Sequence, residues 1–413
     1  MHFSLIRQAF AALLVAMLVS ACGGGSSAAP PAGGITVTPG DGRATVSWTA
    51  DPAVQYWVFY APVSTRFPAV STTDWINIPG AQAFINVKPP FVINGLINGV
   101  QYSFTVNART GDGPGGPGTP AVSALPRPAG TSWAKGGDTG TSALRALTYG
   151  VSSLDTLGYY LAMGDNGSAY KSTTGLTWTA VPAATTTPIN ANIYTLSRFI
   201  GVGNSGTIVY STDLTTWTKG VSNTTENLNA VASNGARAVT VGNNGTIRTT
   251  TDGITWTAAT AVPTTNHLYG VSYTANGFWL AVGAGGTFLR SLDGLTWTLQ
   301  TSGSTANLRA IAVQFITGYT YAVVGDAGTV LLSSDSGTTW VAQSTGLTGN
   351  LLAASATGSQ IVVVGSGGLV AVSANGTTWT AGTTGTTADL FSILAGLSQI
   401  VAVGAGGTNI NSQ

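Results

Sequence analysis

The chain has 413 residues, of which 7% are charged, 44% are hydrophobic and 56 are glycine. Soluble domains usually carry about 25% charged residues, and the 15 basic and 14 acidic residues here nearly cancel, to a formal charge of +1. A nucleic-acid surface needs clustered Lys and Arg, which this balance argues against, and no apolar run reaches the roughly 18 residues of a membrane-spanning helix. We therefore expect large, weakly charged, glycine-rich β domains.

Residues 1–22 resemble the signal peptide of a bacterial lipoprotein. Arg7 provides a basic start, residues 9–19 form a short apolar stretch, and Val19-Ser20-Ala21-Cys22 matches a lipoprotein cleavage box. Cys22 is the sole cysteine, which excludes disulfides and cysteine catalysis. The resemblance implies a lipid anchor on Cys22, and because Gly23 rather than aspartate follows, the sorting rule of enteric lipoproteins favours the outer membrane. A secretory signal with a coincidental cysteine is the alternative.

Residues 23–34 (GGGSSAAPPAGG) have the composition of a flexible tether. The next segment, residues 35–127, contains strand-like stretches at 44–48 and 56–60 and the spacing Leu96-x-x-Gly99-x-x-Tyr102 before a period-two strand. That spacing resembles a tyrosine corner, in which a tyrosine hydroxyl binds the backbone upstream. Together with Trp48, it makes residues 35–127 resemble a fibronectin type III domain, an immunoglobulin-like sandwich that we expect to act as a spacer.

Residues 131–413 repeat a single pattern about every forty residues. An apolar strand ends each time in a glycine, at Gly164, Gly203, Gly242, Gly283, Gly325, Gly365 and Gly404. Seven such motifs, each interpreted as four short strands, predict a seven-bladed β-propeller. Six motifs end in a tryptophan, whereas the seventh stops short of one and Trp133 stands alone ahead of the first. We therefore predict that the strand carrying Trp133 completes the last blade beside residues 408–412, which closes the ring and removes a free sheet edge.

The motif Ser333-x-Asp335-x-Gly337-x-Thr339-Trp340 matches the bacterial neuraminidase repeat, or Asp-box, in full. Shortened versions occur at residues 251–256 and 292–297. The resemblance implies a turn between the two outer strands of a blade and a structural role for these residues. The repeat region as a whole resembles propellers of the photosystem II assembly and stability factor type.

Catalytic residue types are scarce. Outside the predicted signal peptide, His267 is the one histidine, and Glu226 is the one glutamate of the chain. We predict no catalytic residue, no metal site and no cofactor, because no cluster has metal-ligand spacing and a Ser-His-Asp triad cannot be argued from one histidine. A sialidase-like glycoside hydrolase with an atypical site is the alternative, which would need a pair of carboxyl groups at the propeller axis.

The repeat also allows a comparison of the sequence with itself, because a position that varies while its neighbours stay constant is free for function. One such position follows the first Leu or Ile of each motif and holds Arg145, Tyr194, Asn229, Tyr269, Arg309, Leu352 and Phe391. A second variable position follows the strand-ending glycine and holds Asp165, Asn204, Asn243, Ala284, Asp326, Ser366 and Ala405. The sequence leaves open whether the two sets share a face of the propeller.

We expect a ligand site at the mouth of the central channel, formed by Arg145, Tyr194, Asn229, Tyr269, Arg309 and Phe391 with Asp165 and Asp326. Arginine can hold a carboxylate through two hydrogen bonds, and tyrosine can stack on a sugar or grip a peptide. The alternative is that the polar residues only form turns and the tyrosines fill the channel.

These features predict a non-enzymatic, lipid-anchored protein of the bacterial cell envelope or cell surface. Its propeller face would bind a protein or glycan partner in a scaffold, assembly or adhesion role, with no nucleic acid involved. A purely structural surface-layer component is a further possibility, which would predict self-assembly of the purified protein.

Overall fold

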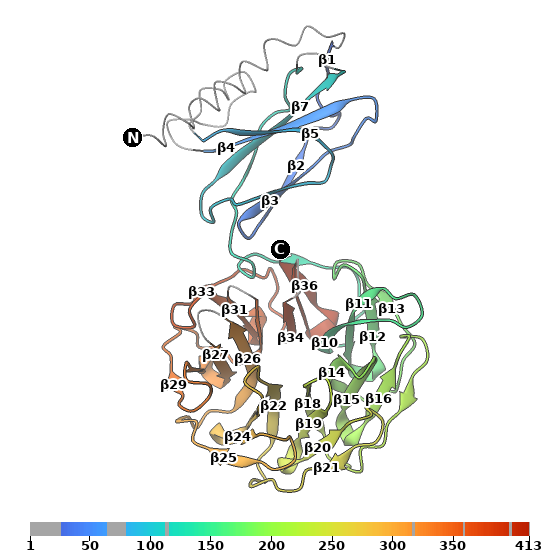
Figure 1. The fold of residues 1–413 in the computed structure, drawn as a ribbon, viewed down its shortest axis with the longest axis vertical. Coiled ribbons are helices and arrows are strands. Elements are labelled where there is room, and N and C mark those ends of the chain that lie inside the picture. Colours follow the sequence, from blue (N-terminus) through green and yellow to red (C-terminus); the bar gives the residue numbers. More distant parts are fainter. Residues whose placement is uncertain are drawn as a thin grey trace. The chain divides into compact units, whose positions relative to one another are not determined.

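The computed structural model describes residues 26–63, 80–111, 115–315, 319–357, 360–395 and 399–412. The chain divides into two compact units, with the boundary between Ala129 and Gly130 (Figure 1). The predicted signal peptide and its Cys22 lie outside the described residues. Within the described ranges, no helix has the length and apolar character needed to cross a membrane.

The first unit consists of two antiparallel sheets. One sheet contains, in order, β1 (Ser26–Ala28), β7 (Tyr102–Thr110), β4 (Gln55–Pro62) and β5 (Gln82–Val87), with β8 (Val122–Ala124) also paired to β7. The other contains β2 (Thr36–Gly40), β3 (Arg43–Ser47) and β6 (Phe91–Asn94). Alternate residues of both sheets form one buried core, for example Ala44 and Val46 from β3 with Phe104 and Val106 from β7.

The predicted tyrosine corner is present in this unit. The Tyr102 hydroxyl accepts a hydrogen bond of 3.2 Å from the N–H of Ile97, five residues upstream. The prediction of an unstructured tether over residues 23–34 is wrong for Ser26–Ala28, which pair with Ala108–Thr110 of β7. The reason is that the free edge of β7 offers main-chain partners, which the composition of the tether does not reveal.

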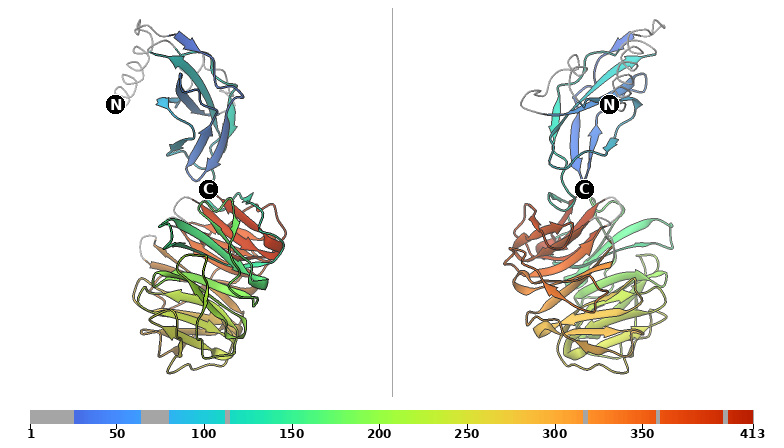
Figure 2. Two further views of the ribbon diagram at one scale, coloured as in Figure 1. Left: turned by 90° about the vertical axis from the view of Figure 1, so that its right-hand side faces the viewer. Right: turned by 60° about the vertical axis from the view of Figure 1, so that its left-hand side comes forward.

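The second unit contains seven four-stranded antiparallel sheets that follow one another around a ring (Figures 1 and 2). The innermost strands are β10 (Leu144–Val151), β14 (Ile189–Thr195), β18 (Leu228–Ser233), β22 (Leu268–Tyr273), β26 (Leu308–Phe315), β30 (Leu351–Ala356) and β34 (Leu390–Ala395). The second strands are β11 (Gly158–Gly164), β15 (Arg198–Gly203), β19 (Ala238–Gly242), β23 (Trp279–Gly283), β27 (Tyr319–Gly325), β31 (Ile361–Gly365) and β35 (Ile400–Gly404). Each innermost strand contacts the next, and β34 contacts β10.

The third strands are β12 (Ala169–Ser172), β16 (Ile208–Ser211), β20 (Ile247–Thr250), β24 (Phe288–Ser291), β28 (Val330–Ser333), β32 (Val370–Ser373) and β36 (Asn409–Ser412). The outermost strands are short: β13 (Thr179–Ala180), β17 (Thr218–Lys219), β21 (Thr257–Ala258), β25 (Thr298–Gln300), β29 (Val341–Ala342), β33 (Thr380–Ala381) and β9 (Ala134–Lys135). The second strands are apolar and buried on both faces because each sheet packs between two others.

The last sheet joins the two ends of this unit. Strand β9, directly after Trp133, pairs with β36, so that Ala134 lies opposite Asn411 and Lys135 opposite Ile410. Asn409, which is 1% exposed, donates from Nδ2 to the carbonyl of Gly137 at 2.7 Å. The pairing predicted from the lone tryptophan is therefore present, with the strand beginning one residue later.

A glycine that ends the turn between the second and third strands allows each sheet to pack against the next inter-sheet loop. A Cβ on Gly167, whose φ is +68°, would lie 1.5 Å from the carbonyl oxygen of Thr185. Gly407 in the last sheet has the same conformation, and its Cβ would lie 2.1 Å from the carbonyl oxygen of Gly140. The segment before β10 thus takes the place of the inter-sheet loop that the last sheet lacks.

Candidate functional site

A one-residue bulge at the start of every innermost strand positions the variable side chains. We number the seven sheets of the second unit in chain order, starting with the sheet of β10 to β13. In the first sheet Leu144 pairs with Gly164 and Ala146 pairs with Met163, so Arg145 between them has no partner on β11. All seven innermost strands carry this irregularity at the same place. A bulge re-aims its side chain away from the regular alternation of the strand. We call the bulged residues the slot ring: Arg145, Asn190, Asn229, Tyr269, Arg309, Leu352 and Phe391.

The structure corrects one member of the predicted set. Ile189, not Ile193, begins the second repeat, because Ile189 pairs with Gly203 as Leu228 pairs with Gly242. Asn190 therefore occupies the slot. Tyr194 lies further along β14, where its ring packs on Phe199 with centroids 4.8 Å apart. Both isoleucines suit the apolar pattern of β14, so hydrophobicity alone favours neither register.

The slot ring touches a second ring of residues, which we call the turn ring: Asp165, Asn204, Asn243, Ala284, Asp326, Ser366 and Ala405. These residues open the turns that follow the second strands. Four of the seven sheets join the two rings by side-chain hydrogen bonds, in the pairs Arg145–Asp165, Asn190–Asn204, Asn229–Asn243 and Arg309–Asp326. The question that the sequence left open is thereby answered, because paired residues lie at the same end of the sheets.

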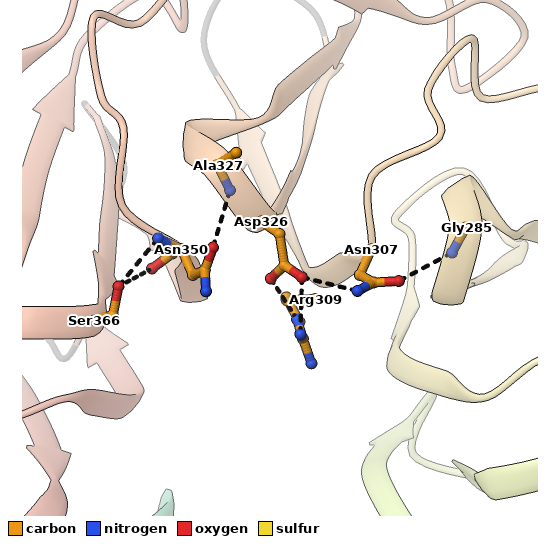
Figure 3. Close-up of polar contacts among 7 residues, drawn as sticks. All are labelled: Gly285, Asn307, Arg309, Asp326, Ala327, Asn350 and Ser366. Atoms are coloured by element: carbon orange, nitrogen blue, oxygen red, sulfur yellow. Dashed lines mark hydrogen bonds and ion pairs between the residues drawn. The ribbon is translucent and has the colours of Figure 1, made fainter.

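In the fifth sheet an ion pair joins Arg309 of the slot ring to Asp326 of the turn ring (Figure 3). Arg309 donates from Nε to Oδ1 of Asp326 at 2.8 Å and from Nη2 to Oδ2 at 2.9 Å. Asn307 donates to the same Oδ2 at 2.9 Å. The pKa of Asp326 is lowered mainly by the hydrogen bond from Arg309, and the same bond raises the pKa of Arg309. Both groups are therefore charged over the physiological pH range.

Each arginine of the slot ring also lies over an aromatic ring from the preceding sheet. The Arg309 guanidinium carbon is 4.6 Å from the ring centroid of Tyr269, and that of Arg145 is 5.2 Å from Phe391. Arg145 donates to both carboxylate oxygens of Asp165, at 2.5 and 3.0 Å. An aspartate of the chain therefore already occupies Nε and Nη2 of both arginines, which are donors that could otherwise hold a ligand carboxylate.

The second and third sheets carry uncharged amide pairs in the same places. Asn190 donates from Nδ2 to Asn204 Oδ1 at 2.8 Å and to the carbonyl of Leu228 at 3.0 Å. Asn229 repeats the arrangement with Asn243 and the next sheet. Among the described residues, Oδ1 of Asn190 and Asn229 and Nδ2 of Asn204 and Asn243 have no hydrogen-bond partner. These four groups remain available to a ligand.

Sequence reasoning missed a set of side chains that join neighbouring sheets at this end. The residue before the first Leu of a repeat accepts a hydrogen bond from a turn N–H of the preceding sheet. Five residues do so at 2.8–3.1 Å: Asn227, His267, Asn307, Asn350 and Asp389. The available signal was the recurrence of Asn, His or Asp at one position of the repeat. His267 thus has a structural partner in the N–H of Asn244.

The motif of the fifth sheet that resembles an Asp-box lies at the other end of the strands. It follows β28 at Ser333, which pairs with Tyr321 near the start of β27, whereas the slot ring lies at the end of β27. Asp335 Oδ1 accepts bonds from the Ser333 hydroxyl at 2.8 Å and from the Thr339 N–H at 2.9 Å. The hydroxyl and N–H of Thr339 hold the pKa of Asp335 at about 2. Gly337, with a φ of +78°, and the partly buried Trp340 complete the turn.

The slot ring and the turn ring are poorly suited to acid–base chemistry. Over the ranges that the structure describes, no group of three or more His, Cys, Asp or Glu side chains comes together to hold a metal ion. A general acid needs a raised pKa, whereas Arg309 lowers that of Asp326. The groups that remain for an interaction are hydrogen-bonding amides, two arginines neutralised by aspartate, and the half-buried apolar side chains of Leu352 and Phe391.

No protein-family model and no curated protein matches the sequence. Solved structures do. One is YCF48 bound to D1 peptide, which is 16% identical, has a TM-score of 0.55, and is matched over 68% of this chain and 94% of that one. Another is YCF48 from Cyanidioschyzon merolae, which is 18% identical, has a TM-score of 0.54, and is matched over 68% and 98% of the two chains. At such low identity the similarity concerns the fold, and it confirms the predicted likeness to these β-propellers.

Proposed function

We propose that this protein is a non-enzymatic scaffold that binds a segment of a partner protein at the slot ring. The protein would consist of a fibronectin type III domain over residues 35–127 and a seven-bladed propeller over residues 131–413, closed by the strand after Trp133. The observation that carries the proposal is the variation of one position across seven otherwise similar sheets. Positions that serve the fold stay constant, and this one brings arginine, asparagine, tyrosine, leucine and phenylalanine to one end of the ring.

Peptide binding is preferred over the other candidate activities. A YCF48 propeller of the same fold has been solved with a D1 peptide bound. In this protein, amide groups beside apolar side chains form a surface whose chemistry suits a peptide. The glycoside-hydrolase alternative loses support because Asp165 and Asp326, the two carboxylates of the rings, are both held by arginine. A retaining or inverting glycosidase needs one of its two carboxyl groups protonated.

A lipid anchor is the second part of the proposal. Its support is the lipoprotein cleavage box that ends at Cys22, and it would hold the protein in the bacterial envelope, at the outer membrane or cell surface. Replacing Cys22 by alanine should abolish incorporation of labelled fatty acid and release the protein from the membrane fraction. Retention of both label and membrane association in this variant would refute the anchor.

Photocrosslinking in cells tests the binding proposal. A photoreactive amino acid at Leu352, a member of the slot ring, should give a protein adduct of defined mass. The matched control is Leu292, which is 70% exposed and lies at the Asp-box end of the fourth sheet. The same adducts from both positions, or adducts from Leu292 alone, would contradict the proposal. Turnover of a fluorogenic sialoside by the purified protein would support the hydrolase instead.

A further inference from the structure

The two arginines of the slot ring are already neutralised in place. Arg145 and Arg309 each give Nε and Nη2 to an aspartate of their own sheet and one face to an aromatic ring. A ligand carboxylate could take this bidentate position only by displacing Asp165 or Asp326. Charge-assisted hydrogen bonds are about twice as strong as neutral ones. Because the ligand carboxylate would replace one charge-assisted bidentate pair by another of the same kind, the exchange brings little net gain in binding free energy.

The surroundings of the ring also disfavour an acidic ligand. The seven loops that lead into the innermost strands contain three carboxylates, Asp138, Glu226 and Asp389, and no Lys or Arg. The two rings contribute two positive and two negative charges, so rings and loops together carry two positive against five negative charges, or −3. Lys135 and Lys219 precede two of the loops but belong to outermost strands. An acidic segment would therefore meet like charge as it approaches.

What the ring does offer is unused amide groups on one side and apolar side chains on the other. The second and third sheets present the free Oδ1 atoms of Asn190 and Asn229 and the free Nδ2 atoms of Asn204 and Asn243. The sixth and seventh sheets, nearly opposite in the ring of seven, present Leu352 and Phe391. Side-chain amide donors and acceptors match the N–H and C=O groups of a polypeptide main chain.

From these observations we infer that the slot ring selects a polypeptide segment without acidic side chains. The segment is held through its main-chain amides at the second and third sheets and through an apolar side chain at the sixth and seventh. This inference rests on the proposed function, which it makes more specific. The aspartates Asp165 and Asp326 act as selectivity residues, because each occupies the Nε and Nη2 donors of its arginine and neutralises its charge.

The test uses the full chain and three sets of fluorescent decapeptides with acetylated and amidated ends. One set contains Asn, Gln, Ser, Gly, Leu and Phe, the second adds Asp and Glu, and the third adds Lys. We expect the uncharged set to bind at least about tenfold more tightly than the acidic set, measured by anisotropy. Binding of the uncharged set should change less than about twofold between 50 and 500 mM salt, because no net charge is neutralised on binding.

The double variant Asp165→Asn/Asp326→Asn should abolish this preference. It frees both arginines, so the acidic set should gain about tenfold or more, and that gain should be lost at high salt. The matched control is Asp293→Asn/Asp335→Asn, which removes the same charge from two Asp-boxes at the other end of the sheets and should leave the preference unchanged. Circular dichroism checks that both variants are folded.

Each outcome bears on the inference. Tightest binding of the acidic set by the unaltered protein would overturn it while leaving peptide binding intact, and so would an equal response of the two double variants. Binding of none of the three sets would overturn the proposed function and this inference with it.

Discussion

Replacing Thr139 by valine should destabilise the second unit as much as the same change at Thr384. The Thr139 hydroxyl donates to the carbonyl of Gly407 at 2.6 Å, and the Thr384 hydroxyl donates to the carbonyl of Gly368 at 2.8 Å. The two threonines are 1% and 8% exposed. Thr384 belongs to an ordinary inter-sheet loop, whereas Thr139 joins the last sheet from a position 268 residues earlier in the chain.

The magnitude follows from the buried carbonyl that each variant leaves without its donor. Such a group costs about 1–3 kcal/mol, and valine keeps the volume of threonine, so little is added by a cavity. In domains of 150–250 residues about 1 kcal/mol moves Tm by about 2–4 °C. We therefore expect each variant to lower the Tm of the second unit by roughly 4 °C, measured by differential scanning calorimetry.

The comparison distinguishes a closed ring from an open one. If the segment 130–140 did not close the last sheet, Thr139→Val would unfold like the unaltered protein while Thr384→Val would remain destabilised. That result would refute the closure argument. If Thr139→Val lowered the Tm and Thr384→Val did not, the Thr139 hydroxyl would hold the closing segment more tightly than the Thr384 hydroxyl holds its inter-sheet loop.

Three further predictions concern individual turns. Because the pKa of Asp335 is lowered to about 2, its contribution to stability is present above pH 4 and is lost as the pH falls toward 2, so Asp335→Asn should flatten the dependence of Tm on pH in this window. Asn375 already fills the equivalent place in the sixth sheet, and therefore the variant should fold, with a lower Tm than the unaltered protein at pH 7 and a similar Tm near pH 2; an unchanged acid profile would contradict the assignment. Alanine at Gly406 or Gly407 meets the same left-handed backbone cost of about 1–2 kcal/mol, but denaturant titration should show ~1–3 kcal/mol more at Gly407, where the Cβ would lie 2.1 Å from a carbonyl oxygen; equal losses would exclude close packing there. Tyr102→Phe should cost the first unit about 1 kcal/mol through loss of its bond to a backbone N–H, and an unchanged unfolding midpoint for that unit would show that the bond is not formed.

The propeller repeat could be predicted because each of its features has a local cause. The strand-ending glycines, such as Gly164, are required by close contact with a main-chain carbonyl, and the apolar second strands are required by burial on both faces. The pairing of β9 with β36 followed from counting alone. The seventh repeat lacked its last strand, and the strand after Trp133 belonged to no complete repeat. Because these requirements recur in seven repeats, the prediction does not depend on a chance match to the pattern in any single repeat.

The position of Asn190 could not be found from hydrophobic pattern, although spacing held a clue. The first Leu and the strand-ending glycine are fourteen residues apart in the third repeat, from Leu228 to Gly242, and Ile189 and Gly203 keep this spacing. Ile193 does not. The bulge that follows Ile189 breaks the period-two alternation, so a strand pattern continued across it assigns side chains to the wrong places.

The sequence by itself determined the all-β composition, the number of repeats, the partner of the lone Trp133 segment and all but one of the residues at the variable positions, because each is a local or countable property of the chain. Tertiary structure alone decided what those positions do to one another. Arg309 and Asp326 are 17 residues apart, and Arg309 stacks on Tyr269 from another sheet. The sequence is the same whether an arginine is free to bind a ligand or is already bonded to an aspartate of the chain. Only the contact between the innermost strands and the turns decides between these two states.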